Sequence, residues 1–215
     1  MGLPCSTALK KMYELMSCLA GYLCGSIPFA YIVTRRSMGL DIREVDIGNM
    51  GAGAVIRTVG VGWGVFVGVG DIVKGFAPVM LAQYLDVGLF WVYATGFAAV
   101  IGHCYPLYIG FRGGHGVATL IGVFLGIVPK AMGLTLLVMG LVLLLHARNR
   151  ASRRIFLAVA VSAPFLPALV YAIYQSVPMV LYSLALVGYV AVRNVRRLRH
   201  PRTITERLLG EMDDQ

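Results

Sequence analysis

Apolar residues fall in seven runs along the chain, and short polar segments separate them. A helix needs about 20 apolar residues to cross the ~30 Å hydrocarbon core of a bilayer, and most of these runs approach that length. The pattern predicts an all-α fold, a polytopic integral membrane helix bundle with about seven transmembrane helices, some of them short or broken. We expect a single integral membrane domain over residues 1–215. The predicted spans are 12–34, 61–84, 88–104, 117–128, 131–145, 155–174 and 178–192.

The overall composition supports this interpretation. Of the 215 residues, 58% are hydrophobic and only 13% are charged, and the mean hydropathy is +0.77. A soluble domain is about half apolar and a quarter charged. The four cysteines form no Cys-x-x-Cys pair, no His, Asp and Glu cluster has metal-ligand spacing, and no phosphate-binding P-loop motif occurs. We therefore expect no metal, no cofactor and no nucleotide-driven transport.

The basic residues predict an orientation in the membrane. Seven crossings place the termini on opposite sides, with Lys10, Lys11 and Lys130 on one side and most arginines on the other. Because positively charged loops stay in the cytoplasm, we expect a cytoplasmic C-terminus and an N-terminus outside. The basic segments of the cytoplasmic side are 35–57, the loop around Arg112, 148–154 and the tail from 193.

Two glycine-rich loops share this predicted cytoplasmic side. Residues 110–119 read Gly-Phe-Arg-Gly-Gly-His-Gly-Val-Ala-Thr, and residues 37–59 contain a second glycine cluster flanked by Arg43 and Arg57. Consecutive glycines expose backbone N–H groups, and a helix that starts after such a loop directs further N–H groups into it. Together with Arg112, this pattern predicts phosphate sites at a membrane surface. Flexible turns between helices are the alternative.

Ionisable residues inside the predicted spans are a further candidate feature. Asp71 and Lys74 lie three residues apart on one face of the second span, and His103 closes the third. Such residues are costly in a membrane, so they pair, face the bundle interior or mark a site. The alternatives are a structural ion pair and a capping histidine. His115 and His200 are candidate proton handlers.

Motifs along most of the chain resemble the bacterial acyl-phosphate:glycerol-3-phosphate acyltransferases, the PlsY family. The resemblance rests on segments in the family's order, with similar spacing. They are Gly25-Ser26-Ile27-Pro28-Phe29, Asp41-Ile42-Arg43, Gly48-Asn49-Met50-Gly51-Ala52 with Arg57, Asp71 with Lys74-Gly75, Gly102-His103-Cys104-Tyr105-Pro106, 110–119, and His200 with Arg207-Leu208-Leu209.

The resemblance implies an enzyme in the plasma (inner) membrane of a bacterium. It would move a fatty acyl group from acyl phosphate to glycerol 3-phosphate, giving lysophosphatidate for phospholipid biosynthesis, with no metal and no nucleic acid as partner. The implied catalytic residues are His200, Arg57 and His115. The implied substrate-binding residues are Asn49, Arg57, Arg43, Gly51, Arg112, Gly113, Gly114, His115, Gly116, Thr203, Asp71, Lys74 and His103.

The chain departs from the family pattern at Ile47, Ala54, His115 and Thr203. Two other hypotheses therefore remain at this stage. One is an altered paralogue with a different acceptor or no turnover. The other is a small transporter of an anionic solute.

Overall fold

The computed structural model describes residues 5–45, 50–146 and 151–199 of the chain, and the side chains of 7–45, 50–146 and 157–195. These residues form eleven α-helices and one short 3-10 helix, and no strand occurs among them. The helices are α1 (Cys5–Gly25), α2 (Phe29–Met38), α3 (Ile42–Val45), α4 (Ala52–Thr58), α5 (Val61–Tyr84), α6 (Leu89–Cys104), η1 (Leu107–Ile109), α7 (Val117–Ile127), α8 (Pro129–Leu145), α9 (Ala151–Ser162), α10 (Phe165–Tyr174) and α11 (Val177–Arg199).

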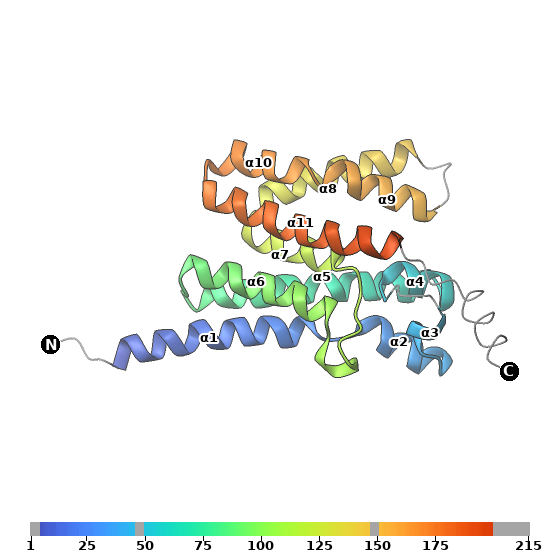
Figure 1. Cartoon of the computed structure of the whole chain (residues 1–215), viewed down its shortest axis with the longest axis horizontal. Coiled ribbons are helices and arrows are strands. Elements are labelled where there is room, and N and C mark those ends of the chain that lie inside the picture. Colours follow the sequence, from blue (N-terminus) through green and yellow to red (C-terminus); the bar gives the residue numbers. More distant parts are fainter. Residues whose placement is uncertain (1–4, 46–49, 147–150, 200–215) are drawn as a thin grey trace.

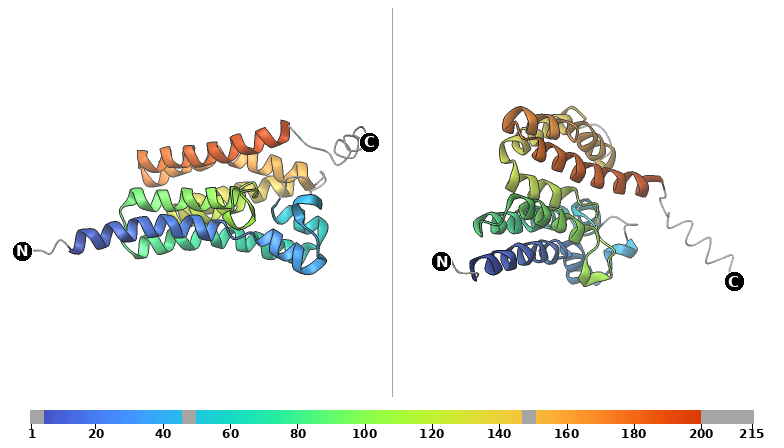
Figure 2. Two further views of the ribbon diagram at one scale, coloured as in Figure 1. Left: turned by 60° about the horizontal axis from the view of Figure 1, so that its bottom comes forward. Right: turned by 60° about the vertical axis from the view of Figure 1, so that its left-hand side comes forward.

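The longer helices run roughly along one common axis and form a bundle (Figures 1 and 2). α1, α5 and α6 make up one side of it, α8, α9 and α10 the other, and α7 lies between them. The short helices α2, α3 and α4 gather at one end of the bundle, where α11 also ends. This end is called the basic end below, because Arg35, Arg57 and Arg112 lie on its segments.

The predicted spans agree closely with the observed helices. Five segments are long and apolar enough to cross a membrane, namely Thr7–Met38, Val61–Tyr84, Leu89–Ile109, Leu157–Tyr174 and Val177–Val195. The shorter apolar helices α7 and α8 correspond to the remaining two predicted spans. At 1.5 Å per residue α7 is only about 16 Å long, so its full crossing stays a prediction.

Several details differ from the sequence interpretation. The connection predicted for 37–59 contains two short helices, α3 and α4. The predicted span 155–174 is two helices, since α9 ends at Ser162 and α10 begins at Phe165, directly after its N-cap Pro164. The turn predicted at Pro129 and Lys130 lies one residue earlier, at Val128, and Pro129 begins α8. Proline is well suited to that first helical position, since its missing N–H has no intrahelical partner there.

Small residues bring the central helices into close contact. A Cβ added to Gly25 of α1 would lie less than 3.0 Å from the backbone of Ala99 in α6, and one on Gly122 of α7 would meet the backbone of Ile72 in α5. Lipid provides little hydrophobic driving force between helices, so close backbone packing at small residues is a main source of association. These two contacts hold α1 against α6 and α7 against α5.

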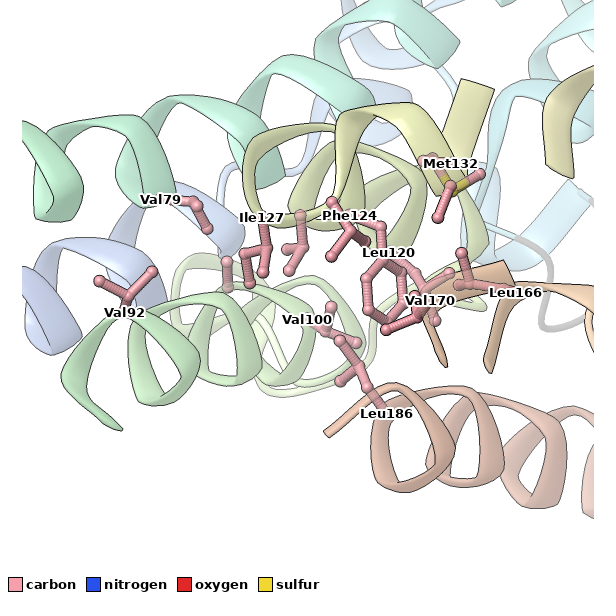
Figure 3. Close-up of a cluster of buried hydrophobic side chains, with 14 of the residues drawn as sticks. Val79, Val92, Val100, Leu120, Phe124, Ile127, Met132, Leu166, Val170 and Leu186 are labelled. Atoms are coloured by element: carbon pink, nitrogen blue, oxygen red, sulfur yellow. The ribbon is translucent and has the colours of Figure 1, made fainter. Parts of the chain in front are cut away.

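A cluster of buried apolar side chains joins the two sides of the bundle (Figure 3). Phe124 of α7 is 1% exposed and lies among residues of α5, α6, α10 and α11. Many large apolar side chains elsewhere are exposed, such as Val65 of α5 and Leu137 of α8. Exposed apolar side chains on membrane-length helices are the surface that a bilayer would cover.

The first predicted span is broken at its proline, as its sequence predicts. α1 ends at Gly25 and α2 begins at Phe29, with Pro28 between them. Pro28 has no N–H to donate, so the regular helix cannot continue through it. The break leaves the carbonyl of Ile27 available inside the bundle, where Lys74 donates to it at 2.8 Å.

Candidate active site

The two glycine-rich loops meet at the basic end of the bundle. The guanidinium of Arg43, from the first loop, donates through Nη1 to the carbonyl of Ile109 at 3.0 Å, at the start of the second. Met50 and Gly114 line the same pocket from the two loops. The sequence prediction that these loops share one face of the protein is confirmed.

Backbone hydrogen bonds fold the second loop back onto the end of α6. The N–H of Gly113 donates to the carbonyl of Cys104 at 3.2 Å, and that of Gly114 to the carbonyl of His103 at 3.1 Å. A Cβ on Gly114 would lie less than 3.0 Å from the ring of His103 and from the carbonyl of Met50. Glycine is therefore required here for close packing.

The loop leads directly into α7. Gly116 has φ +87 and is the N-cap residue of this helix, a left-handed conformation that suits glycine far better than other residues. The first N–H groups of an α-helix have no intrahelical acceptor and carry the positive end of its dipole. The loop thus ends at a helix N-terminus, as its sequence predicts, and anion binding there stays a prediction.

Three ionisable side chains form a buried cluster beneath this loop. Lys74 Nζ lies 2.8 Å from Asp71 Oδ1, and His103 Nδ1 lies 3.6 Å from the same oxygen. Asp71, Lys74 and His103 are 2%, 5% and 6% exposed. The predicted placement of Asp71 and Lys74 on one helical face is confirmed, and both are paired. His103 faces this pair across the α5–α6 interface, so it does more than cap α6.

A small pocket that opens to solvent lies above the cluster. Its lining combines the α1–α2 break, the buried cluster and both glycine-rich loops. The lining residues are Pro28, Phe29, Ala30, Met50, Asp71, Lys74, His103, Pro106, Ile109, Gly113 and Gly114. Among the predicted site residues, Asp71, Lys74, His103, Gly113 and Gly114 are brought together here.

Two predicted arginines lie outside this lining. Arg57 on α4 and Arg112 in the second loop are both exposed, and neither is among the residues that line the pocket. The phosphate contacts expected of both guanidinium groups therefore stay predictions. Gly51, the N-cap residue of α4, and His115 are half-buried. Asn49, His200 and Thr203 lie outside the described residues.

Arg43 makes several contacts within the protein, and the substrate contact expected for it stays a prediction. Its guanidinium donates to both carboxylate oxygens of Asp41, to the carbonyl of Ile109, and lies 5.3 Å from the ring centroid of Tyr31. These hydrogen bonds hold the pKa of Asp41 below its ordinary value. Arg43 therefore joins the two loops, and its donors are directed at protein acceptors.

Sequence reasoning missed two residues of α11 that contact the second loop. Arg193 donates to the carbonyls of Cys104 and Gly114, and Asn194 donates to the carbonyl of His115 at 3.5 Å. In the sequence, Arg193 follows the last apolar run, and that position assigns it only to the basic tail. Its position at the basic end of the last span was the available signal.

Fold and site together define the class: a polytopic integral membrane protein with a charged, partly enclosed pocket where two glycine-rich loops meet at one end of the bundle. Within the described ranges, no group of three or more His, Cys, Asp and Glu side chains is placed to hold a metal ion.

Comparisons with known proteins identify the family. Residues 15–201 match the family model described as glycerol-3-phosphate acyltransferase. The glycerol-3-phosphate acyltransferase of Geotalea daltonii is 39% identical over 186 residues, covering 86% of this chain and 94% of its own length. That of Rubrobacter xylanophilus is 37% identical over 199 residues, covering 93% and 96%. This chain belongs to the glycerol-3-phosphate acyltransferase family.

Solved structures agree with this assignment. The crystal structure of PlsY (YgiH), an integral membrane glycerol 3-phosphate acyltransferase, in its glycerol 3-phosphate form is similar with a TM-score of 0.75. It is 30% identical, and the match covers 91% of this chain and 98% of that one. The lysophosphatidic acid form matches with a TM-score of 0.72 and 28% identity. The family resemblance drawn from the motifs is confirmed, and it favours an acyltransferase over an anion transporter.

Proposed function

We propose that this chain transfers a fatty acyl group from acyl phosphate to glycerol 3-phosphate, giving lysophosphatidate and inorganic phosphate. Its family membership makes it an acyltransferase of phospholipid synthesis. The observation that carries the proposal is the pocket shared by the two glycine-rich loops, at whose base Lys74 and His103 lie. We propose acyl phosphate as the acyl donor, and we propose the individual contacts of the chain with both substrates.

The second loop is suited to the phosphate of the acyl donor. The loop leads into the start of α7, which offers the first N–H groups of the helix and a positive dipole. Arg112 is exposed at the loop surface, where its guanidinium can pair with a phosphate in a forked geometry. This arrangement would hold the leaving group while the acyl chain lies among the apolar helices.

The first loop and its neighbours would bind glycerol 3-phosphate. Arg57 and Asn49 would contact its phosphate, and His115, His200 and Thr203 would complete the site. A phosphate ester carries about two negative charges, so guanidinium and amide donors are the groups that recognise it. Arg57 lies on α4, which starts directly after the glycine cluster of this loop.

The reaction then needs no nucleophile from the protein. A hydroxyl oxygen of glycerol 3-phosphate attacks the acyl carbon, and a new ester C–O bond forms. The bond between the acyl carbon and the phosphate oxygen breaks, and the departing phosphate accepts the hydroxyl proton. The chain contributes by orienting both substrates and by stabilising the charge that develops on the oxygen atoms of the acyl phosphate.

The same features support a proposed orientation in the membrane. The positive-inside rule favours the basic end as the cytoplasmic end. The N-terminal part of α1 lies at the opposite end (Figure 1), and Lys130 lies beside Tyr174 at the α10–α11 turn. We therefore propose an inner-membrane protein with its N-terminus outside and its C-terminus in the cytoplasm, so that soluble glycerol 3-phosphate reaches the pocket from the cytoplasm.

A reconstituted assay tests the donor and the acceptor separately. Purified protein receives acyl phosphate and labelled glycerol 3-phosphate, and parallel reactions contain acyl-CoA or an acyl carrier protein thioester as donor. We expect lysophosphatidate only with acyl phosphate. The Geotalea daltonii relative, purified identically, controls for loss of activity in detergent. Product from that relative but none from this chain would refute the proposal, and product only with a thioester would refute the donor.

A further inference from the structure

Arg193 connects the last helix to the second glycine-rich loop. Its Nη2 donates to the carbonyl of Cys104 at 2.7 Å, and its Nε donates to the carbonyl of Gly114 at 3.4 Å. Its guanidinium also lies 4.4 Å from the ring centroid of Tyr105. The side chain is half-buried, and its contacts lie 79 and 89 residues away along the sequence.

These contacts fall where the chain leaves α6, at residues 104–105, and where it returns toward α7, at residues 113–115. These two segments are called the neck of the loop below. The carbonyl of Cys104 accepts from Arg193 and also from the N–H of Gly113, which lies on the segment that returns toward α7. The carbonyl of Gly114, which also accepts from Arg193, lies on that same returning segment. One guanidinium thus contacts both sides of the neck and keeps them together.

The next residue of α11 adds a further contact. Asn194 Nδ2 donates to the carbonyl of Val190 within its own helix at 2.8 Å and to the carbonyl of His115 at 3.5 Å. The intrahelical bond holds the amide at the surface of α11. Arg193 and Asn194 therefore touch successive residues of the loop, immediately before Gly116 and the start of α7.

A loop with this many glycines needs such support. Fixing the backbone of one residue costs about 1–2 kcal/mol, and glycine loses more freedom than other residues. Gly110, Gly113, Gly114 and Gly116 all lie in the segment between η1 and α7. An anchor that fixes this segment before substrate arrives lowers the ordering cost of binding.

We propose that Arg193 is a positioning residue that holds the neck of the glycine-rich loop, so that the N-terminus of α7 faces the phosphate of the acyl donor. The inference rests on the proposed function for the identity of that ligand. The contact between Arg193 and the loop is independent of it. Asn194 supports the same segment at His115.

The principal test is a kinetic comparison of Arg193→Ala, Arg193→Lys and the wild-type protein. We expect Arg193→Ala to raise the KM for acyl phosphate about 10-fold or more. The KM for glycerol 3-phosphate should rise less, because His115 is the one residue of its proposed site that lies on the anchored loop. Arg193→Lys keeps the charge but loses the forked donors, so it should fall between the two. Arg36→Ala, which removes an exposed arginine of α2 at the same end, is the matched control and should behave as wild type.

A second measurement does not depend on turnover. Hydrogen exchange of a peptide covering the second loop, measured on the protein in nanodiscs, should be about 10-fold faster in Arg193→Ala than in wild type and unchanged in Arg36→Ala. If the wild type makes no product while exchange accelerates, the proposed function fails and the positioning role stands. Unchanged exchange, or unchanged KM values with activity that merely follows the folded fraction, would overturn the positioning role.

Discussion

The buried pair of Asp71 and Lys74 gives the sharpest test of the structure. The perturbation is Lys74→Met, which keeps an unbranched side chain one atom shorter and removes its charge. Lys74 Nζ makes two bonds of 2.8 Å, one to Asp71 Oδ1 and one to the carbonyl of Ile27. After the substitution, the carboxylate of Asp71 remains almost fully enclosed and the carbonyl at the α1–α2 break loses a donor.

The expected magnitude follows from that burial. Removing one partner of a buried ion pair costs about 3–5 kcal/mol, because the other charge is left without compensation. The unfolding equilibrium should therefore shift by roughly 10²- to 10⁴-fold toward the unfolded state. Asp71→Asn should also destabilise the protein. The double variant should lose less than the sum of the two, with a coupling of about 2 kcal/mol.

Unfolding in mixed micelles with rising denaturing detergent, followed by tryptophan fluorescence, measures these free energies. The two tryptophans are Trp63 on α5 and Trp91 on α6, so both report on the helices that carry the cluster. Lys10→Met, at an exposed position of α1, is the control and should change stability by less than about 0.5 kcal/mol. Single losses below about 1 kcal/mol that add up in the double variant would refute the reasoning.

Three further predictions follow from the packing and the loops. Gly122→Leu forces a side chain against the backbone of α5 and should cost about 3 kcal/mol or more in the same unfolding assay, whereas Gly133→Leu meets open space and should cost little. Gly114→Ala should reduce activity about 10-fold or more in protein that still elutes as a folded monodisperse species, and normal activity would argue against the close loop packing. The pKa of Asp41 is lowered by Arg43, so the stability this pair contributes should be present above the ordinary carboxyl pKa of about 3.9 and lost as the pH falls through the lower folded value. A stability–pH profile of Asp41→Asn should lack that acid-side decrease, and a profile identical to wild type would contradict the assignment.

His115 is one of the positions at which the chain departs from the family pattern. His115 is half-buried at the point where Asn194 contacts the loop, so its backbone is held while its side chain is partly accessible. Comparing His115→Lys with wild type over pH 6–8 in the reconstituted assay measures whether a permanent charge at this position changes the KM for either substrate.

The sequence alone determined the class of fold, the family and the two loops that form the candidate site. Membrane-length apolar runs report helices directly, because in lipid each helix must satisfy its own backbone hydrogen bonds. Glycine clusters, Pro28 and the motif order are equally local features, so the helix break, the two loops and the family could be predicted without coordinates. The pairing of Asp71 with Lys74 follows from helical spacing alone.

Only the tertiary structure decided what the arginines contact within the protein. Arg43, whose expected substrate contact stays a prediction, joins the two loops, and Arg193, which the sequence assigns only to a basic tail, contacts the neck of the second loop. Arginines look alike in a sequence, and their partners here are mostly backbone carbonyls, which carry no sequence signature. Whether a guanidinium meets such a carbonyl depends on how helices dozens of residues apart pack together, and no local pattern encodes that arrangement.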